Sequence, residues 1–185
     1  MQTQDHTESM IRGSGMRMSD YWALAVPFAE FVQAAAPEHR GLWDGLYRTA
    51  RAPAWATGPL PAPRNLLAIA EDWCVDTSSA LPVLARWAEA APGLTLRVIR
   101  RDAHPELMNR YLTLGTRSIP VIIVLDAELQ ELGHWGPYPV PLEEWVRGHK
   151  PPAMPKEEFV KGKRGWYAKD RGETMLRELE PLVRG

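Results

Sequence analysis

The stretch that decides the fold is Asn65-Leu-Leu-Ala-Ile-Ala-Glu-Asp-Trp-Cys-Val-Asp-Thr-Ser-Ser-Ala-Leu-Pro82. It opens with a short apolar run, residues 66–70, which contains the β-branched Ile69. An unbroken apolar run of this length predicts a strand buried on both faces, as in a parallel sheet. From Ser78 onward, apolar residues recur at helical spacing, at Leu81, Leu84, Ala85 and Ala88. Cys74 therefore falls where a strand gives way to the N-terminus of a helix.

This position gives Cys74 a chemical role to consider. The first backbone N–H groups of a helix have no intrahelical partner, and the helix dipole favours negative charge there. Such a site stabilises a thiolate, so we expect a solvent-reachable, reactive thiol. The competing interpretation is an inert buried cysteine, which is the common state of a lone cysteine. Negative charges at Glu71, Asp72 and Asp76 oppose thiolate formation, so the pKa of Cys74 is expected near the ordinary value of about 8.5.

The segment Trp73-Cys74-Val75-Asp76-Thr77 resembles the Trp-Cys-x-x-Cys centre of the thioredoxin superfamily, with threonine in place of the second cysteine. Pro82 matches the kink proline of that family's active-site helix. Arg117-Ser118-Ile119-Pro120, followed by the apolar run 121–125, is similar to the family loop whose cis-proline faces the cysteine. The resemblance implies a cis peptide bond before Pro120.

A subgroup of bacterial thioredoxin-like proteins resembles the chain over nearly its whole length. Its members combine a helical N-terminal arm, a Trp-Cys-x-Asp centre and an Arg-Ser-Ile-Pro loop. Two further motifs match, Trp135-Gly136-Pro137 and Trp166-Tyr167-Ala168-Lys169-Asp170. The implied fold is α/β and thioredoxin-like, a central mixed sheet flanked by helices, with extra helices at both termini.

The expected organisation is one compact domain in four parts. They are a disordered leader (residues 1–17), an N-terminal helical arm (18–53), a thioredoxin-like core (62–150) and a C-terminal helical extension (151–185). In the arm, Ser19 is the predicted N-cap of a helix that continues to Val32 and is bent or split at Pro27.

The remaining elements follow from apolar spacing and from proline and glycine positions. Helices are predicted over residues 39–50, 105–112 and 142–149, strands over 94–99, 121–125 and 128–135, and one or two helices beyond 151. Pro105 suits the first position of its helix, and Gly115 is its expected stop.

Composition excludes several classes of protein. The net charge of −1 over 185 residues gives no reason to expect nucleic acid as a partner. No apolar run approaches the ~20 residues needed to span a bilayer, and the polar start is not a secretory signal. A single cysteine rules out an intramolecular disulfide and favours a reducing cytoplasm.

Thr77 decides what the thiol can do. Threonine cannot attack a mixed disulfide, so Cys74 would form one that an external thiol such as glutathione must resolve. One interpretation has the Thr77 hydroxyl donating a hydrogen bond to the thiolate, which would lower the thiol pKa. The other has Thr77 satisfying backbone groups in the first helical turn. Asp76 is expected to stabilise the helix, because its negative charge lies near the positive end of the helix dipole. In the alternative role, it accepts the proton of Cys74.

The substrate-binding prediction rests on the family loop. A cis-proline there exposes the backbone of Ile119, so that an extended peptide can pair with it. Ser118 and Arg117 flank this surface; Arg117 is either a carboxylate-binding group or a solvated arginine. Trp73 is expected to border the site.

Two main hypotheses follow. The first is a monothiol thiol–disulfide oxidoreductase acting on a disulfide-containing or glutathionylated protein or a small thiol. The second is a non-catalytic module that binds a peptide or protein in the same groove. No bound cofactor and no metal site are expected, since the histidines do not cluster. Iron–sulfur carriage as in monothiol glutaredoxins is disfavoured because the tetrad from Cys74 to Thr77 lacks their Cys-Gly-Phe-Ser signature.

Overall fold

The structure, a computed structural model, describes residues 15–185. Its helices are α1 (Met18–Leu24), α2 (Phe28–Gln33), α3 (Pro37–Thr49), α4 (Val75–Ala90), α5 (Pro105–Met108), α6 (Val140–His149), α7 (Lys156–Asp170) and α8 (Glu173–Arg184), with a 3₁₀ turn η2 (Ala54–Ala56). Its strands are β1 (Val26–Pro27), β2 (Arg64–Ala70), β3 (Leu94–Arg100), β4 (Val121–Leu125) and β5 (Glu131–Trp135).

The five strands form one mixed sheet in the order β1-β3-β2-β4-β5. Strands β2 and β3 are parallel and are joined through α4, whereas β4 runs antiparallel to β2 and β5 antiparallel to β4. Ala68 at the middle of β2 lies between Val98 of β3 and Ile122 of β4. The expected mixed sheet flanked by helices is confirmed.

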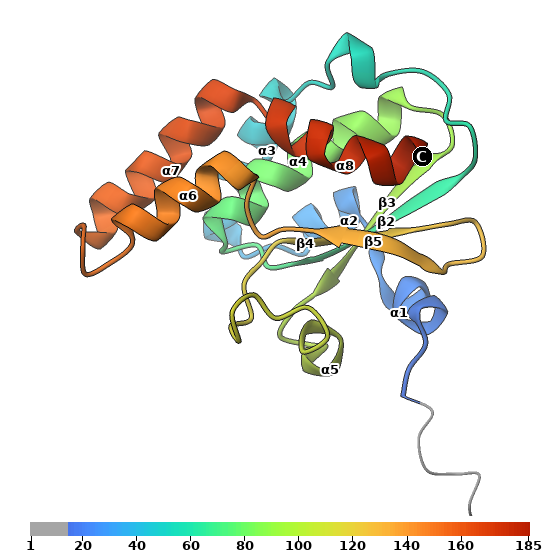
Figure 1. Ribbon diagram of the computed structural model, residues 1–185, viewed down its shortest axis with the longest axis horizontal. Helices are drawn as coiled ribbons and strands as arrows, with labels where there is room; N and C mark the ends of the chain where they lie inside the picture. Colours follow the sequence, from blue (N-terminus) through green and yellow to red (C-terminus); the bar gives the residue numbers. More distant parts are fainter. Residues whose placement is uncertain (1–14) are drawn as a thin grey trace, which may run out of the picture.

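Both faces of the sheet are covered, which explains the unbroken apolar run in β2 (Figure 1). Leu66 and Ala68 belong to the core on the face covered by α4 and α8. Leu67 and Ile69 belong to the core on the opposite face, with side chains of α1 and α5. Since successive residues of a strand point to opposite faces, both sets must be apolar.

The N-terminal arm differs from its prediction. The helix is split at Pro27, but two residues at the split form β1, which pairs antiparallel with β3. Arg17 rather than Ser19 is the N-cap of α1, and its backbone N–H donates to Asp20 Oδ2 at 2.8 Å. The Ser19 prediction was therefore wrong, because an aspartate in the first turn satisfies the helix start instead.

The helix after Pro105 is shorter than predicted. Pro105 does occupy its first turn, but α5 ends at Met108. The chain then turns sharply, with Thr113 and Thr116 exchanging backbone hydrogen bonds of 2.9 Å. A tight turn there provides the polar backbone with partners that a longer helix would otherwise supply.

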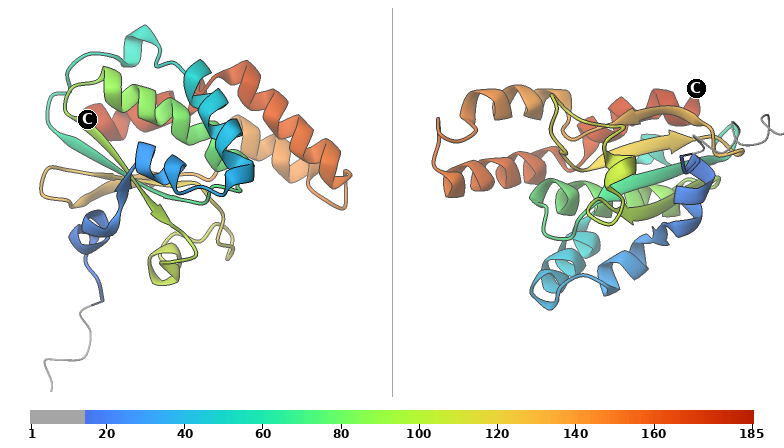
Figure 2. Two further views of the ribbon diagram at one scale, coloured as in Figure 1. Left: turned by 180° about the vertical axis from the view of Figure 1, so that it is seen from behind. Right: turned by 90° about the horizontal axis from the view of Figure 1, so that it is seen from below.

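The C-terminal extension forms two helices that meet at Gly172. Its φ of +81° lies in the left-handed region, and a Cβ there would come within 2.6 Å of Val83 Cγ1. Both facts require glycine at position 172, so this residue determines where α7 ends and α8 begins. Helix α8 then lies over the sheet beside α4 (Figures 1 and 2) and buries four side chains in the main core: Met175, Leu176, Leu179 and Val183.

Residues 1–14 of the predicted leader lie outside the described residues. Within the leader's last three positions, the Met16 carbonyl accepts a hydrogen bond of 2.7 Å from Arg110. Within the described part of the chain, none of the helices combines the length and apolarity that crossing a membrane requires.

Candidate functional site

Cys74 occupies the junction predicted from the sequence. It is the N-cap residue of α4, with extended dihedral angles of φ −83° and ψ 124°. Its carbonyl accepts the first helical hydrogen bond, from the Ser78 N–H at 2.9 Å. The strand β2 thus delivers the sulfur to the positive end of a sixteen-residue helix.

The sulfur lies against the proline loop. Cys74 Sγ is 3.5 Å from the carbonyl oxygen of Ile119, to which the thiol donates a hydrogen bond. The Ile119–Pro120 peptide bond is cis. Gly136 backs this loop: its φ is +122°, and a Cβ there would come within 2.2 Å of the Pro120 oxygen. The Trp135-Gly136-Pro137 turn therefore packs directly against the backbone of the Pro120 loop, and this close approach requires glycine at the centre of the turn.

The thiol is less accessible than the sequence predicts. Cys74 is only 9% exposed, and it belongs to the core cluster on the face of the sheet that includes Ile119 and Ile69. Burial raises the pKa of Cys74, and the negative charge of Asp76 raises it further. The pKa of Cys74 is therefore raised rather than ordinary, and little of the residue's surface reaches solvent. The favourable interaction of a thiolate with the helix N-terminus is smaller than the effect of burial on the pKa of Cys74.

Thr77 lies one turn along α4 and is fully buried. Its hydroxyl makes no hydrogen bond of ordinary geometry to any residue from 15 to 185, so the backbone-satisfying interpretation has no support. Its side chain and its N–H nevertheless act on the sulfur to lower the pKa of Cys74. The structure is thus consistent with a hydroxyl available to the thiolate, although burial and Asp76 outweigh it in the resting thiol.

Asp76 is tied to the C-terminal extension. Its Oδ2 lies 2.5 Å from Lys163 Nζ, and its Oδ1 accepts a hydrogen bond of 3.1 Å from the Tyr167 hydroxyl, both from α7. Burial raises the pKa of Asp76, while Lys163 and Tyr167 act to lower it. Both carboxylate oxygens of Asp76 bind side chains of α7. Asp76 therefore joins α4 to α7 in addition to its interaction with the helix dipole.

Lys163 and Tyr167 are the site residues that sequence reasoning missed. Lys163 is 7% exposed, which is rare for lysine unless it is paired. Its ammonium also lies 5.2 Å from the ring centre of Phe159 and 5.6 Å from that of Tyr138. Tyr167 lies in a motif that matches the bacterial subgroup, but the motif does not indicate its contact with Asp76. Lys163 lies in a polar helix, and nothing in the surrounding sequence indicates that this lysine is buried.

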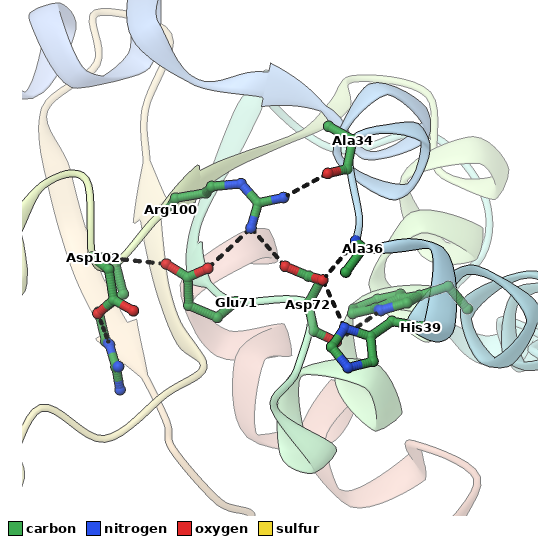
Figure 3. Close-up of polar contacts among 9 residues, drawn as sticks. Ala34, Ala36, His39, Glu71, Asp72, Arg100 and Asp102 are labelled. Carbon is green, nitrogen blue, oxygen red and sulfur yellow. Dashed lines mark hydrogen bonds and ion pairs between the residues drawn. The ribbon is translucent and has the colours of Figure 1, made fainter.

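The two acids before Trp73 form a network with Arg100 of β3 and with the segment from Ala34 to His39 (Figure 3). Arg100 donates to Glu71 at 3.0 Å and to Asp72 at 2.7 Å. Asp72 also accepts from the Ala36 N–H at 3.0 Å and is 2.8 Å from His39 Nδ1. Desolvation alone would raise the pKa of Asp72, but hydrogen bonds from Arg100, His39 and Ala36 outweigh it and lower that pKa well below its usual range. Glu71 and Asp72 are therefore compensated by cations, and of the three acids only Asp76 contributes to the raised pKa of Cys74.

The predicted substrate-binding residues lie around this centre. Trp73 is 51% exposed, with the guanidinium carbon of Arg101 4.8 Å from its ring centre. Ser118 Oγ is 2.8 Å from Thr116 Oγ1. Arg117 is exposed, and its Nε donates to Asn109 at 2.9 Å. Arg117 thus has a local partner for its Nε and remains exposed.

Within residues 15–185, no group of three or more histidine, cysteine or acidic side chains is arranged to hold a metal ion.

Comparisons with known proteins agree with this geometry. A family model described as thioredoxin matches residues 25–156. The solved structure of a protein of unknown function from Pseudomonas aeruginosa superposes with a TM-score of 0.71 at 18% identity, covering 91% of this chain and 98% of that one. An HIV epitope-scaffold superposes with a TM-score of 0.67 at 18% identity, covering 89% of this chain and 96% of its own. A search of curated proteins gave no match.

Proposed function

Because the chain belongs to the thioredoxin family, we propose that it is a monothiol thiol–disulfide oxidoreductase whose reacting atom is Cys74 Sγ. The observation that supports this proposal is the 3.5 Å contact between Sγ and the Ile119 carbonyl, at a cis-proline loop facing a helix N-terminus. A disulfide bound in extended form along Ile119 would approach this sulfur directly.

In the proposed reaction, Cys74 loses its proton to solvent and the thiolate attacks one sulfur of a substrate disulfide. A bond forms between Sγ and that sulfur, while the substrate S–S bond breaks and releases the other half as a thiolate. The chain has no second cysteine, so an external thiol, for which glutathione is the proposed donor, attacks the mixed disulfide. That attack restores the Cys74 thiol and leaves the donor disulfide-bonded to the substrate half that Cys74 had held. A second donor thiol then attacks the donor sulfur of that disulfide and releases the substrate half as a thiol. Two donor thiols thus become one donor disulfide as one substrate disulfide becomes two thiols.

The surrounding residues have distinct roles in this proposal. Thr77 donates its unpaired hydroxyl to the thiolate once it forms. Ile119 and Pro120 hold the substrate backbone, and Trp73 provides an exposed apolar wall. Ser118 and Arg117 lie at the rim, where the guanidinium attracts a carboxylate such as those of glutathione. The substrates are disulfide-containing or glutathionylated proteins or small disulfides, in the reducing cytoplasm that a single free cysteine suits.

The second candidate function is a non-catalytic module that binds a peptide or protein at the same loop. The specific observation in its favour is the burial of Cys74, together with the raised pKa that follows from it. A thiol that stays protonated near neutral pH reacts slowly, because the thiolate is the nucleophile. In this alternative, the sulfur serves as a small buried apolar group next to the loop.

A glutathione-coupled assay with a small disulfide substrate separates the two. We expect turnover that increases from pH 7 to pH 9 as the thiolate fraction increases, and that is lost in Cys74→Ser. We also expect Thr77→Cys to reduce insulin with dithiol kinetics, because the second cysteine would stand where resolving cysteines stand in this family. Absence of turnover at both pH values, with correctly folded protein, would leave the binding module as the function.

A further inference from the structure

A groove in the described part of the chain lies away from the sulfur, and Cys74 is not among the residues that line it. It has a volume of about 640 Å³ and lies between α3, the second turn of α4 and the C-terminal half of α7. This volume falls within the range of about 300–1,000 Å³ typical of small-molecule sites. Tyr167 lines this groove and reaches Asp76 with its hydroxyl, but none of the reacting or substrate-binding groups proposed above lines it, so the groove needs its own explanation.

Part of the groove's lining is apolar. Leu42 and Leu46 of α3 and Val83 of α4 line it. Leu42 remains 39% exposed although it lies on a helix that otherwise packs on α4. The groove therefore offers apolar surface to an aliphatic or aromatic group.

The rim is cationic. Arg51 follows α3, whereas Arg164 and Arg171 belong to α7 and its C-cap; all three line the groove, and no aspartate or glutamate lines it. Within residues 15–185, none of these three arginines forms an ion pair with a carboxylate. Arg51 donates only to the carbonyls of Arg48 and Ala50.

The hydroxyl groups that line the groove are already engaged. Thr49 donates to the Gly45 and Leu46 carbonyls, and Ser78 and Ser79 both donate to the Val75 carbonyl at 2.9 Å. The guanidinium groups are thus the donors left to select a ligand. Because they are positively charged and bind planar oxyanions in bidentate fashion, they select a carboxylate.

We propose that this groove binds a small amphipathic carboxylate, with its apolar chain against Leu42, Leu46 and Val83 and its carboxylate held by Arg164 and Arg171. The site is independent of the proposed thiol chemistry, so either proposal can fail without the other. A medium-chain fatty acid is the simplest ligand with this combination of charge and apolar length.

Calorimetric titration of the full chain with decanoate tests the proposal. We expect saturable binding with a Kd below about 1 mM, and at least about 10-fold weaker binding of decanol, which has the same chain without the charge. The double variant Arg164→Gln/Arg171→Gln should weaken decanoate at least about 10-fold. Lys161→Gln, which removes an exposed cation from the same helix, should leave binding unchanged, as should Cys74→Ser.

Three outcomes would overturn the proposal. They are a lack of saturable decanoate binding, equal affinities for decanoate and decanol, and an unchanged affinity in the double arginine variant. Arg164 is exposed, and the hydrogen bond that Arg171 makes at the end of α7 comes from its backbone, so these two substitutions test binding rather than folding.

Discussion

Lys163 of α7 places its ammonium 2.5 Å from Asp76 of α4, across 87 residues of sequence. Both side chains are less than 10% exposed. The pair joins the C-terminal extension to the first turn after Cys74, so the extension contributes to the electrostatics of the thiol. Removing one partner of such a pair leaves an uncompensated charge in a desolvated position.

Lys163→Met should therefore lower the free energy of unfolding by about 3 kcal/mol. The buried Asp76 carboxylate would lose its cation and would have to protonate or draw in water. Lys161→Met on the same helix removes an exposed lysine and should change stability by less than about 0.5 kcal/mol. Urea unfolding of both variants measures the difference; equal stabilities would show that the pair contributes nothing net.

Asp76→Asn should make Cys74 more reactive. The substitution removes a negative charge that raises the pKa of the thiol and leaves the Lys163 cation nearby, so both effects favour the thiolate. Iodoacetamide alkylation at pH 7 should become roughly threefold to tenfold faster. Glu128→Gln, at an exposed position, serves as the charge-matched control.

The same variant tests the proton-acceptor role. If Asp76 accepts the proton of Cys74 during exchange, Asp76→Asn should slow turnover in the glutathione-coupled assay even as alkylation speeds up. If alkylation does not speed up, the charge of Asp76 does not control the thiol.

Thr77→Val should raise the pKa of Cys74. Valine keeps the shape of threonine but removes the hydroxyl that acts on the sulfur. Alkylation at pH 7 should slow by about threefold, while stability should stay within about 1 kcal/mol, since the hydroxyl has no ordinary hydrogen bond to lose. A large loss of stability with an unchanged alkylation rate would instead assign Thr77 a purely structural role.

Local sequence signals were sufficient for β2 and for the place of the sulfur, whereas the mixed sheet was implied by the family resemblance and β1 was not predicted. The apolar run of β2 predicts a doubly covered strand, and the change of spacing after it predicts α4 with Cys74 at its start. Both are local patterns, because strand burial and helix spacing repeat within a few residues.

The accessibility and charge environment of the sulfur were not predictable in this way. They depend on the proline loop, whose Ile119 carbonyl lies against the sulfur, and on Lys163, which compensates Asp76. From the sequence alone, Glu71 and Asp72 are two uncompensated acids beside the thiol. In the structure Arg100 pairs with both acids and His39 contacts Asp72, and both partners are distant in sequence. Ion pairs between residues far apart in sequence produce no repeating pattern that a single sequence would reveal.

The Arg100 network gives a pH-dependent prediction. The pKa of Asp72 is lower in the folded protein than in the unfolded chain, so its ionisation stabilises the fold. That stabilisation is complete above the unfolded pKa of about 3.9 and is lost as the pH falls through the lower folded pKa. Asp72→Asn removes it, and we expect the variant to be about 2–4 kcal/mol less stable than the parent at pH 7.

The stability difference between the parent and Asp72→Asn should narrow as the pH is lowered below about 4, because the parent then loses the same ionised carboxylate. Glu71, His39 and Arg100 remain in both proteins. Asp44→Asn, at an exposed position of α3, should match the parent within about 0.5 kcal/mol at pH 7. Urea unfolding from pH 7 to pH 3 measures all three proteins. A difference that stays constant over this range would mean that Asp72 stabilises the loop before Cys74 by shape and hydrogen bonding rather than by its charge.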